Sequence, residues 1–324
     1  MHPPLSELLA TAHVVSLPLA VKFRGIWSRE IMLFQGLEGW TEFSPFVEYN
    51  DDEAVHWLRA AIEFGWQPLP KLHRDEIKVN ATVPAVAPDQ VAEVLSHFDG
   101  CRTAKVKVGE PGQLLSEDVE RVREVRRILG PEGRIRVDAN AAWNVDEAEH
   151  AFHALAEFDL EYVEQPCASL EELAELRERT HYMDVLIAAD ESIRKAEDPR
   201  AVAQAVAADV LVLKAQPLGG ISKIVELSEE VTLPIVLSSA LESSVGIAMG
   251  LYAAAAVKVL DYDCGLGTAS LLAGDVTEAP MVAQGGSIAV QRPAVSEDLL
   301  ERFAASSDTT AWWLERLERC YNLL

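Results

Sequence analysis

Polar residues close a series of short apolar segments at nearly constant spacing, and this regularity constrains the fold more than any other feature. The closing residues are Asp138, Glu164, Asp190, Lys214 and Ser238, so the successive intervals are 26, 26, 24 and 24 residues. Each interval accommodates one strand and one helix, which is the length of a parallel βα unit. The segments predicted as strands are 103–108, 134–139, 162–164, 186–189, 210–213 and 234–237.

Helix start signals fall between these strands. Asn144 is followed three residues later by Glu147, and Ser169 by Glu172. Both pairs are typical of a capping box at a helix N-terminus. The alternation is too long for a small doubly wound sheet, whereas an eightfold barrel of roughly 250 residues fits the chain after residue 80. The sequence therefore predicts an α/β fold of the (β/α)8-type.

The N-terminal stretch, to about residue 80, has a mixed α and β pattern instead. Residues 30–35 are predicted as a strand and residues 54–64 as a helix. Asn50 and Glu53 form the N-terminal cap of that helix, and Gly65 is expected to end it.

Charged side chains fall at the predicted carboxyl ends of the barrel strands, where the mouth of a barrel lies. They are Lys105, Lys107, Asp138, Glu164, Asp190 and Lys214. Residues 105 and 107 stand two apart on one strand, so both lysines point to the same side. The three acidic residues close three successive strands, and Lys214 closes the next.

This combination of residue types suggests a particular chemistry. Three converging carboxylates would repel one another and raise their own pKa values. A divalent cation relieves the repulsion, and ligands that are all oxygen favour a hard ion such as Mg²⁺, with Mn²⁺ accepted by the same set. Lysines near that cation would have lowered pKa values and could act as bases. The set suits removal of a proton from the carbon next to a carboxylate.

Structural interpretations compete with this one. An aspartate at a strand end is often the N-cap of the next helix, but Asp138 lies six residues before Asn144 and is poorly placed for that. Glu191 follows Asp190 directly and is an alternative ligand. Lys214 follows four apolar residues, where an unpaired amine would be costly.

Composition argues against several classes of partner and site. The chain has 28 Lys and Arg against 52 Asp and Glu, a formal net charge of −24, so nucleic acid and anionic membranes are poor partners. The eight histidines form no cluster at strand ends, which argues against a zinc site. The cysteines are far apart, at Cys101, Cys167, Cys264 and Cys320. Their spacing favours free thiols in a reducing, cytoplasmic location.

As a set, these residues resemble the muconate-lactonizing-enzyme subgroup of the enolase superfamily. The resemblance rests on Lys105-Val106-Lys107, Arg136-Val137-Asp138-Ala139-Asn140, Glu164-Gln165-Pro166, Asp190-Glu191-Ser192 and Lys214. It extends to Arg24-Gly25, Arg29-Glu30 and Glu42-Phe43-Ser44-Pro45-Phe46, and so covers nearly the whole chain. It implies a modified (β/α)8-type barrel with an α+β capping domain. Residues 1–80 would form the cap, residues 81–290 the barrel, and residues 291–324 a segment that returns to the cap.

The resemblance also implies roles for individual residues. Asp138, Glu164 and Asp190 would bind Mg²⁺. Catalysis would fall to Lys107 and Lys214, which flank the substrate, with Lys105 supporting the first of them. Substrate contacts are expected from Asn140, Arg136, Ser238, Ser239 and Gly265.

Reactions of the subgroup include racemisation, epimerisation, cycloisomerisation and dehydration. The short chain, residues 45–49 and the serine-rich segment 238–244 are most similar to dehydratases that act on a cyclohexadiene carboxylate in menaquinone biosynthesis. A lyase with a small-molecule carboxylate substrate is therefore expected. The alternatives are an N-acylamino acid racemase, a dipeptide epimerase that uses Asp261 or Asp263 to hold an ammonium group, and an inactive barrel that only binds. Cap domains of this kind often pack into dimers or larger rings, so homo-oligomerisation is a further expectation.

Overall fold

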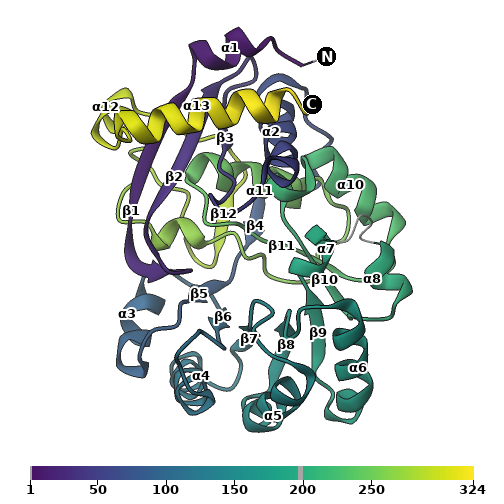
Figure 1. Ribbon diagram of the computed structural model, residues 1–324. Helices are drawn as coiled ribbons and strands as arrows, with labels where there is room; N and C mark the ends of the chain where they lie inside the picture. The colour runs from purple at the N-terminus through teal and green to yellow at the C-terminus, as the bar shows by residue number, and fades with distance from the viewer. Residues whose placement is uncertain (1, 196–199) are drawn as a thin grey trace.

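The computed structural model describes residues 2–195 and 200–324 and contains a barrel with a cap above it (Figure 1). Seven parallel strands form one continuous sheet in the order β11-β10-β9-β8-β7-β6-β5. They are β5 (Ala81–Val83), β6 (Thr103–Lys107), β7 (Arg134–Asp138), β8 (Leu160–Glu164), β9 (Leu186–Ala189), β10 (Val210–Leu213) and β11 (Ile235–Leu237). The six predicted strands agree with these bounds to within two residues.

Residues 264 and 265 close the sheet into a barrel. Ser238, just after β11, forms a parallel bridge with Gly265, and Cys264 forms another with Val79, just before β5. The amide of Gly265 donates to the carbonyl of Leu237 at 2.8 Å. This short segment therefore occupies the position of an eighth strand, and the predicted barrel is confirmed.

Helices cover the outside of the barrel. The α-helices of this part are α3 (Val91–Ser96), α4 (Leu115–Leu129), α5 (Val145–Leu155), α6 (Leu170–Thr180), α7 (Glu191–Lys195), α8 (Arg200–Gln204), α9 (Ala215–Leu218), α10 (Ile221–Glu230) and α11 (Ser244–Ala256). The 3₁₀ helices are η1 (Pro88–Gln90), η2 (Ala156–Phe158), η3 (His181–Met183) and η4 (Thr268–Leu271). The capping boxes predicted at Asn144 and Ser169 are both present, at the starts of α5 and α6.

Both ends of the chain build the cap. Its elements are α1 (Leu5–Ala10), β1 (His13–Phe23), β2 (Ile26–Gln35), β3 (Trp40–Phe43), α2 (Asp51–Trp66), α12 (Glu297–Arg302) and α13 (Ser307–Tyr321). Strands β4 (Glu76–Lys78) and β12 (Ser287–Ala289) pair as an antiparallel ribbon. In the sequence, β4 precedes the first barrel strand and β12 precedes the C-terminal helices of the cap. Strands β1, β2 and β3 form an antiparallel sheet, and α13 crosses the cap in Figure 1.

The C-terminal helix is held to the cap by specific contacts. The ring of Trp313 meets that of Phe43 edge-on at 5.8 Å, and its Nε1 donates to Glu30 at 2.9 Å. Arg316 donates to the carbonyls of Phe46 and Tyr49. The predicted return of the C-terminal segment agrees with these contacts, while the residue limits of the three segments remain a prediction.

The expected role of Gly65 was wrong. Asn50 and Glu53 form the predicted capping box, but α2 continues through Gly65 to Trp66. A Cβ added at Gly65 would lie 2.8 Å from Cγ2 of Thr41. The glycine is therefore needed for close packing of α2 on β3, because any side chain there would collide with the strand.

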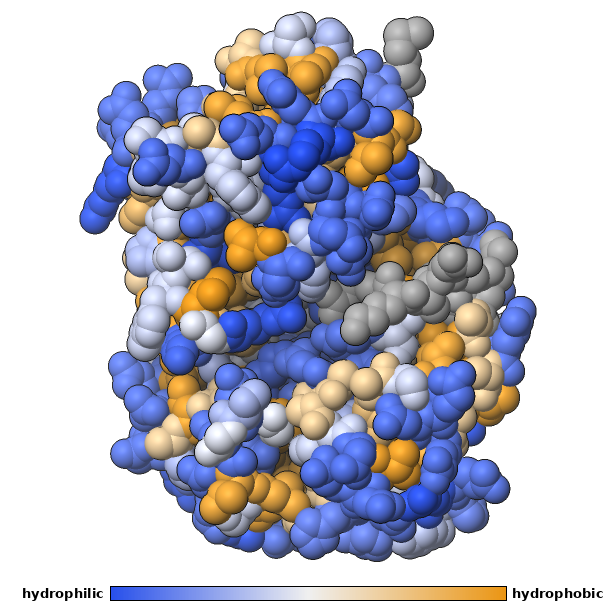
Figure 2. All heavy atoms as spheres, in the orientation of Figure 1, coloured by the Kyte–Doolittle hydropathy of each residue, from blue (hydrophilic) through white to orange (hydrophobic). Residues whose placement is uncertain are grey.

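The surface carries mostly polar side chains on the face shown in Figure 2, with apolar side chains in small groups. Within residues 2–195 and 200–324, no helix combines the length and the apolar character that crossing a bilayer requires. The four cysteines are free thiols, and Cys167, Cys264 and Cys320 are buried.

Candidate active site

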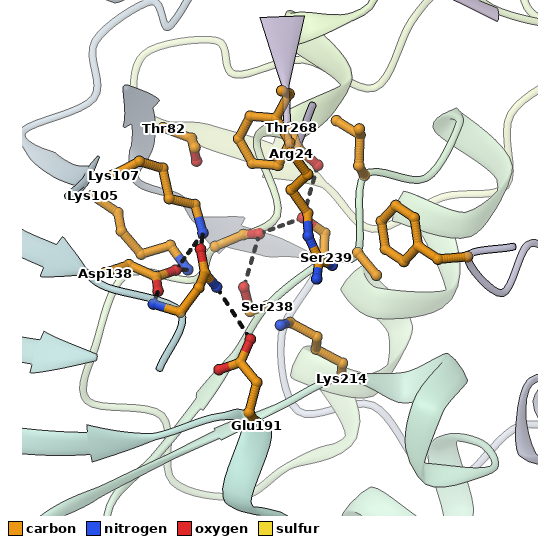
Figure 3. Close-up of a pocket in the computed structure, with 16 residues that line it drawn as sticks. Arg24, Thr82, Lys105, Lys107, Asp138, Glu191, Lys214, Ser238, Ser239 and Thr268 are labelled. Carbon is orange, nitrogen blue, oxygen red and sulfur yellow. Dashed lines mark hydrogen bonds and ion pairs between the residues drawn. The ribbon is translucent and has the colours of Figure 1, made fainter. Parts of the chain in front are cut away.

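A pocket lies at the carboxyl ends of the barrel strands, below the turn that joins β1 to β2 (Figure 3). It is lined by Phe23, Arg24, Phe46, Thr82, Lys105, Lys107, Asp138, Asn140, Glu191, Lys214, Ser238, Ser239, Ala240, Leu241, Gly265 and Thr268. The inner cavity measures about 30 Å³ and continues into hollows of about 270 and 390 Å³. Arg24 and Asn140 line all three spaces, so they stand where the inner cavity opens outward.

Lysines of β6 hold the carboxylates on one side of the pocket. The Nζ of Lys107 lies 2.6 Å from Oδ2 of Asp138 and 2.7 Å from Oδ1 of Asn140. Lys105 lies deeper, and its Nζ contacts both carboxylate oxygens of Glu164, at 2.9 and 3.1 Å. It also lies 3.3 Å from Oδ2 of Asp138. The two lysines therefore share one face of the strand, as the spacing predicts.

Lys214 approaches from the other side of the same pocket. Its ammonium group is bonded to Oδ2 of Asp190, and Figure 3 shows it facing Lys105 and Lys107 across the cavity. The Asp190 backbone is itself fixed, because its amide and that of Ser192 both donate to Oε1 of Gln165. The pocket thus has an amine on each of two opposite walls.

Burial and neighbouring charges shift the pKa values of the pocket's ionisable groups in different directions. Burial lowers the pKa of Lys107, and the adjacent Lys105 lowers it further. Burial acts the same way on Lys105, but the charges of Glu164 and Asp138 outweigh it and raise the pKa of that lysine. For Asp138, Lys107 and Lys105 overcome burial and lower the pKa, whereas burial and Asp138 raise the pKa of Glu164 to about 7. Lys107 is therefore the amine of this pair that gives up a proton more easily.

The donor chemistry fits a hard divalent cation, although ammonium groups now hold the carboxylates. Asp138, Glu164 and Asp190 are each no more than 1% exposed and offer only oxygen ligands. Within the described ranges, 2–195 and 200–324, no three acidic, histidine or cysteine side chains are close enough together to hold an ion. Binding an ion by these residues therefore requires carboxylates to exchange an ammonium partner for the cation.

The serine-rich segment forms a wall of the pocket. Ser239 donates to the carbonyl of Gly265 at 2.7 Å and bonds to the hydroxyl of Thr268 at 2.7 Å. Ser238 lies 3.5 Å from the same carbonyl. A Cβ at Gly265 would lie 2.5 Å from Oγ of Ser238, so only glycine lets this wall close. Asn140, Ser238, Ser239 and Gly265 thus all line the pocket, while their contact with substrate stays a prediction.

Arg136 does not reach the pocket. It is fully buried inside the barrel, two residues before Asp138 on β7. Its guanidinium donates to Glu161 at 2.5 Å, to the side chain of Asn80 at 3.1 Å and to the carbonyl of Asp263 at 2.7 Å. Alternation along β7 places Arg136 on the same face as Asp138, which is the inside of the barrel. Arg136 lies below the mouth, however, and its guanidinium is hydrogen-bonded there.

The two aspartates considered for binding an ammonium group also lie away from the mouth. Asp263 accepts hydrogen bonds from Thr103 at 2.7 Å and Arg134 at 2.6 Å, the first residues of β6 and β7. Asp261 lines a different surface groove, next to the residues that lead into β11. Neither carboxylate faces the pocket, so this feature of a dipeptide epimerase is not in place.

The loop around Leu19 to Arg24 is expected from the sequence to help close the site, but the sequence does not indicate which of its side chains face the substrate. The structure places Arg24 at the pocket. Arg24 and Gly25 form a two-residue hairpin loop with φ values of 48° and 80°, as in a type I′ turn. The turn carries the guanidinium of Arg24 over the ring of Phe46, at 4.5 Å, and toward the cavity (Figure 3). An X-Gly pair between two strands is a sequence signal for such a turn, but not for what it faces.

Comparisons with known proteins decide the family. Residues 89–294 match the family described as enolase C-terminal domain-like, and residues 14–65 match the one described as enolase N-terminal domain-like. The chain belongs to the enolase superfamily. Enzymes of this superfamily depend on a divalent metal ion.

Superfamily members with curated names and solved structures are similar over nearly the whole chain. The o-succinylbenzoate synthase of Mycobacterium tuberculosis is 52% identical over 323 residues, which cover 99% of this chain and 97% of the relative. The muconate lactonizing enzyme of Pseudomonas fluorescens has a TM-score of 0.78 at 20% identity, over 91% of this chain and 98% of that one. The L-Ala-D/L-Glu epimerase of Bacillus subtilis has a TM-score of 0.72 at 23% identity, over 88% and 96%. The two structures support the superfamily fold.

Proposed function

We propose that this protein acts as an o-succinylbenzoate synthase. The reaction is the dehydration of 2-succinyl-6-hydroxy-2,4-cyclohexadiene-1-carboxylate to 2-succinylbenzoate, a step in menaquinone biosynthesis. The observation that carries the proposal is the placement of Lys107 and Lys214 on opposite walls of one pocket, each bonded to a buried strand-end carboxylate. The 52% identity to the mycobacterial enzyme supports this substrate.

The residues of the pocket divide the reaction between them. Lys107, with its lowered pKa, takes the proton from the ring carbon that bears the carboxylate. The same lysine then returns that proton to the departing hydroxyl group, so one water leaves and the ring becomes aromatic. Lys214 stays cationic beside Asp190 and stabilises the negative charge that develops on the substrate carboxylate.

Asp138, Glu164 and Asp190 would hold Mg²⁺, or Mn²⁺ in its place, which supplies positive charge next to the substrate carboxylate. Lys105 would keep the Glu164 and Asp138 carboxylates in position and lower the pKa of Lys107. Asn140 would orient Lys107, to which it is bonded, and Ser238, Ser239 and Gly265 would line the substrate.

The substrate has two carboxylates, and Arg24 is suited to the second. Its side chain faces the cavity where the inner space opens into the two larger hollows. A guanidinium binds carboxylates through paired hydrogen bonds. We assign it to the succinyl carboxylate, which would extend outward from the reacting ring.

Turnover of the cyclohexadiene substrate, followed by ultraviolet absorbance with Mg²⁺ and then with EDTA, tests the proposal. Lys107→Ala and Lys214→Ala should each lower kcat by about 10²–10⁴-fold, because each removes a group that acts on the reacting atoms. Lys258→Ala is the matched control, since the ammonium group of Lys258 is exposed and pairs with the surface residue Glu229, away from the pocket. Wild-type protein that binds Mg²⁺ but does not dehydrate the substrate would contradict the proposal.

Two amines on opposite walls also suit an N-acylamino acid racemase, in which one lysine removes the proton and the other returns it. Incubation of N-acylamino acids with the protein in D₂O distinguishes the racemase hypothesis from the dehydratase hypothesis. Exchange of the α-proton at a rate well above dehydration would favour the racemase. An inactive barrel is disfavoured because the three carboxylates and three lysines are all present at the mouth.

A further inference from the structure

Thr82 carries a buried hydroxyl group that the protein itself leaves unsatisfied. It is the middle residue of β5 and only 1% exposed. Within the part of the chain that the structure describes, its Oγ1 has no hydrogen-bond partner. The neighbouring hydroxyls differ, since Ser239 and Thr268 bond to each other. An unpaired buried hydroxyl destabilises a fold, so its presence in a strand that valine would fill equally well requires an explanation.

The position of Thr82 places this hydroxyl against the reacting groups. In the parallel register of β5 and β6, Thr82 pairs with Lys105. Paired residues of adjacent strands present their side chains on the same face, which here is the inside of the barrel. Thr82 lines the pocket together with Lys105, Lys107 and Gly265, and Figure 3 shows its side chain directed toward the cavity.

We propose that the Thr82 hydroxyl is a substrate-binding group that donates a hydrogen bond to an anionic carboxylate oxygen of the bound substrate. A hydroxyl can donate or accept, whereas an ionised carboxylate only accepts, so the Thr82 hydroxyl is the donor toward this substrate. The inference rests on the proposed function, whose substrate carries two carboxylates. Thr82 takes no part in proton transfer; it fixes the substrate between Lys107 and Lys214.

Thr82→Val tests the inference, because it removes the hydroxyl and keeps the shape of the side chain. Hydrogen bonds to charged groups contribute about 1.5–3 kcal/mol, so kcat/KM should fall by about 10- to 100-fold. The midpoint of thermal unfolding should stay the same or rise, since an unsatisfied polar group has been removed. Thr82→Ser, which restores the hydroxyl, should recover most of the lost kcat/KM.

Thr103→Val is the matched control. Thr103 is also a buried strand threonine, but its hydroxyl donates to Asp263 at 2.7 Å and accepts from Arg134 at 3.0 Å, away from the pocket. This substitution should lower the unfolding midpoint and leave kcat/KM within about twofold, since it breaks a bond within the protein. Thr82→Val should therefore lower kcat/KM without lowering the unfolding midpoint, and Thr103→Val should lower the unfolding midpoint without lowering kcat/KM.

The outcomes separate this inference from the proposed function. Wild-type turnover with an unchanged kcat/KM in Thr82→Val would overturn the role of Thr82 and leave the function standing. A loss of stability in Thr82→Val as large as in Thr103→Val would also overturn it, because the hydroxyl would then serve the fold. Absence of wild-type turnover would overturn the proposed function and, with it, the inference.

Discussion

Two groups of buried carboxylates in this protein are held by different kinds of partner. At the barrel mouth, Asp138, Glu164 and Asp190 are bonded to the ammonium groups of lysines. Where the cap meets the barrel, Glu42 of β3 accepts hydrogen bonds from the hydroxyls of Ser44 and Ser243 and from the amide of Gly246, at 3.0 Å. We call the first three acids the mouth cluster, and Glu42 with the neighbouring buried acid Glu242 the junction cluster.

The hydrogen-bond partners of each carboxylate affect its pKa. In the mouth cluster, Lys107 and Lys105 lower the pKa of Asp138 although it is buried. In the junction cluster, burial and the charge of Glu242 raise the pKa of Glu42 to about 7. Arg29 is close to both junction acids, but it donates its hydrogen bonds to backbone carbonyls, those of Leu241, Glu30 and Ser44. Neutral donors leave Glu42 with a raised pKa, whereas Lys107 and Lys105 overcome burial at Asp138. At Glu164, burial and the charge of Asp138 outweigh the contact with Lys105, so its pKa is raised to about 7 as well.

The junction cluster has a structural role. Glu42 caps the N-terminus of α11 from a strand of the cap, since the Ser243 and Gly246 amides both donate to it. The residues just before α11, Ser238 to Leu241, form a wall of the pocket. The junction cluster therefore holds the cap against the wall that the mouth cluster faces.

The largest expected difference between the clusters concerns removal of one partner. Lys105→Met leaves Glu164 buried without its ammonium group, so in EDTA the free energy of unfolding should fall by about 3–5 kcal/mol. Ser44→Ala removes one neutral donor from Glu42 and should lower it by about 1 kcal/mol. Guanidinium-induced unfolding of both variants measures the difference. Equal losses would mean that the kind of partner does not matter.

The dependence of stability on pH should distinguish Glu42 of the junction cluster from Asp138 of the mouth cluster. Between pH 4.5 and pH 7 the folded protein keeps a proton on Glu42 that the unfolded chain releases. The free energy of unfolding contributed by this group therefore falls as pH rises through that window and levels off above it. Glu42→Gln has no such proton, so the difference between variant and wild type should change by up to about 3 kcal/mol.

Urea-induced unfolding at a series of pH values across this window provides the measurement. Glu132→Gln is the control, because Glu132 is exposed on the surface. Its difference from wild type should stay nearly constant over the window. A flat difference for Glu42→Gln as well would show that Glu42 is ionised across this window, as Asp138 is.

A smaller effect is expected when metal is added, and it should involve only the mouth cluster. At 100 times its dissociation constant, Mg²⁺ should raise the free energy of unfolding by about 2.7 kcal/mol, because it binds the folded protein. Asp190→Asn should lose most of this gain, while Glu42→Gln should keep it. Thermal unfolding with and without Mg²⁺ gives the comparison, and a gain retained in Asp190→Asn would place the ion elsewhere.

Much of this arrangement could be predicted from the sequence where short-range rules apply. Apolar segments closed by Asp138, Glu164 and Lys214 predict the strands, because a strand buried on both faces needs a continuous apolar run. Alternation places Lys105 and Lys107 on one face. The same rules misread Gly65, since glycine is as useful for close packing as for ending a helix, and only the approach of Thr41 distinguishes the two.

Depth within the barrel is the main property that these rules miss. Arg136 and Asp138 share a face of β7, yet Arg136 is bonded to Glu161 and Asn80 below the mouth. Thr82 lines the pocket although no motif marks it in the sequence. Arg24 belongs to a loop that is expected to help close the site, but its side chain could not be assigned to the pocket from the sequence. Their importance depends on what they face, which is set by contacts distant in sequence.

The sequence by itself determined the kinds of group available and their order along the strands: three carboxylates, three lysines and a serine-rich segment at barrel spacing. Only the tertiary structure decided which ammonium group holds which carboxylate, which hydroxyl is left without a partner, and which wall the cap supports. These outcomes depend on closure of the barrel, where Cys264 meets Val79, and on docking of Glu42 against α11. Side chains far apart in the chain interact only after such long-range contacts form, so local sequence patterns do not specify the pairs.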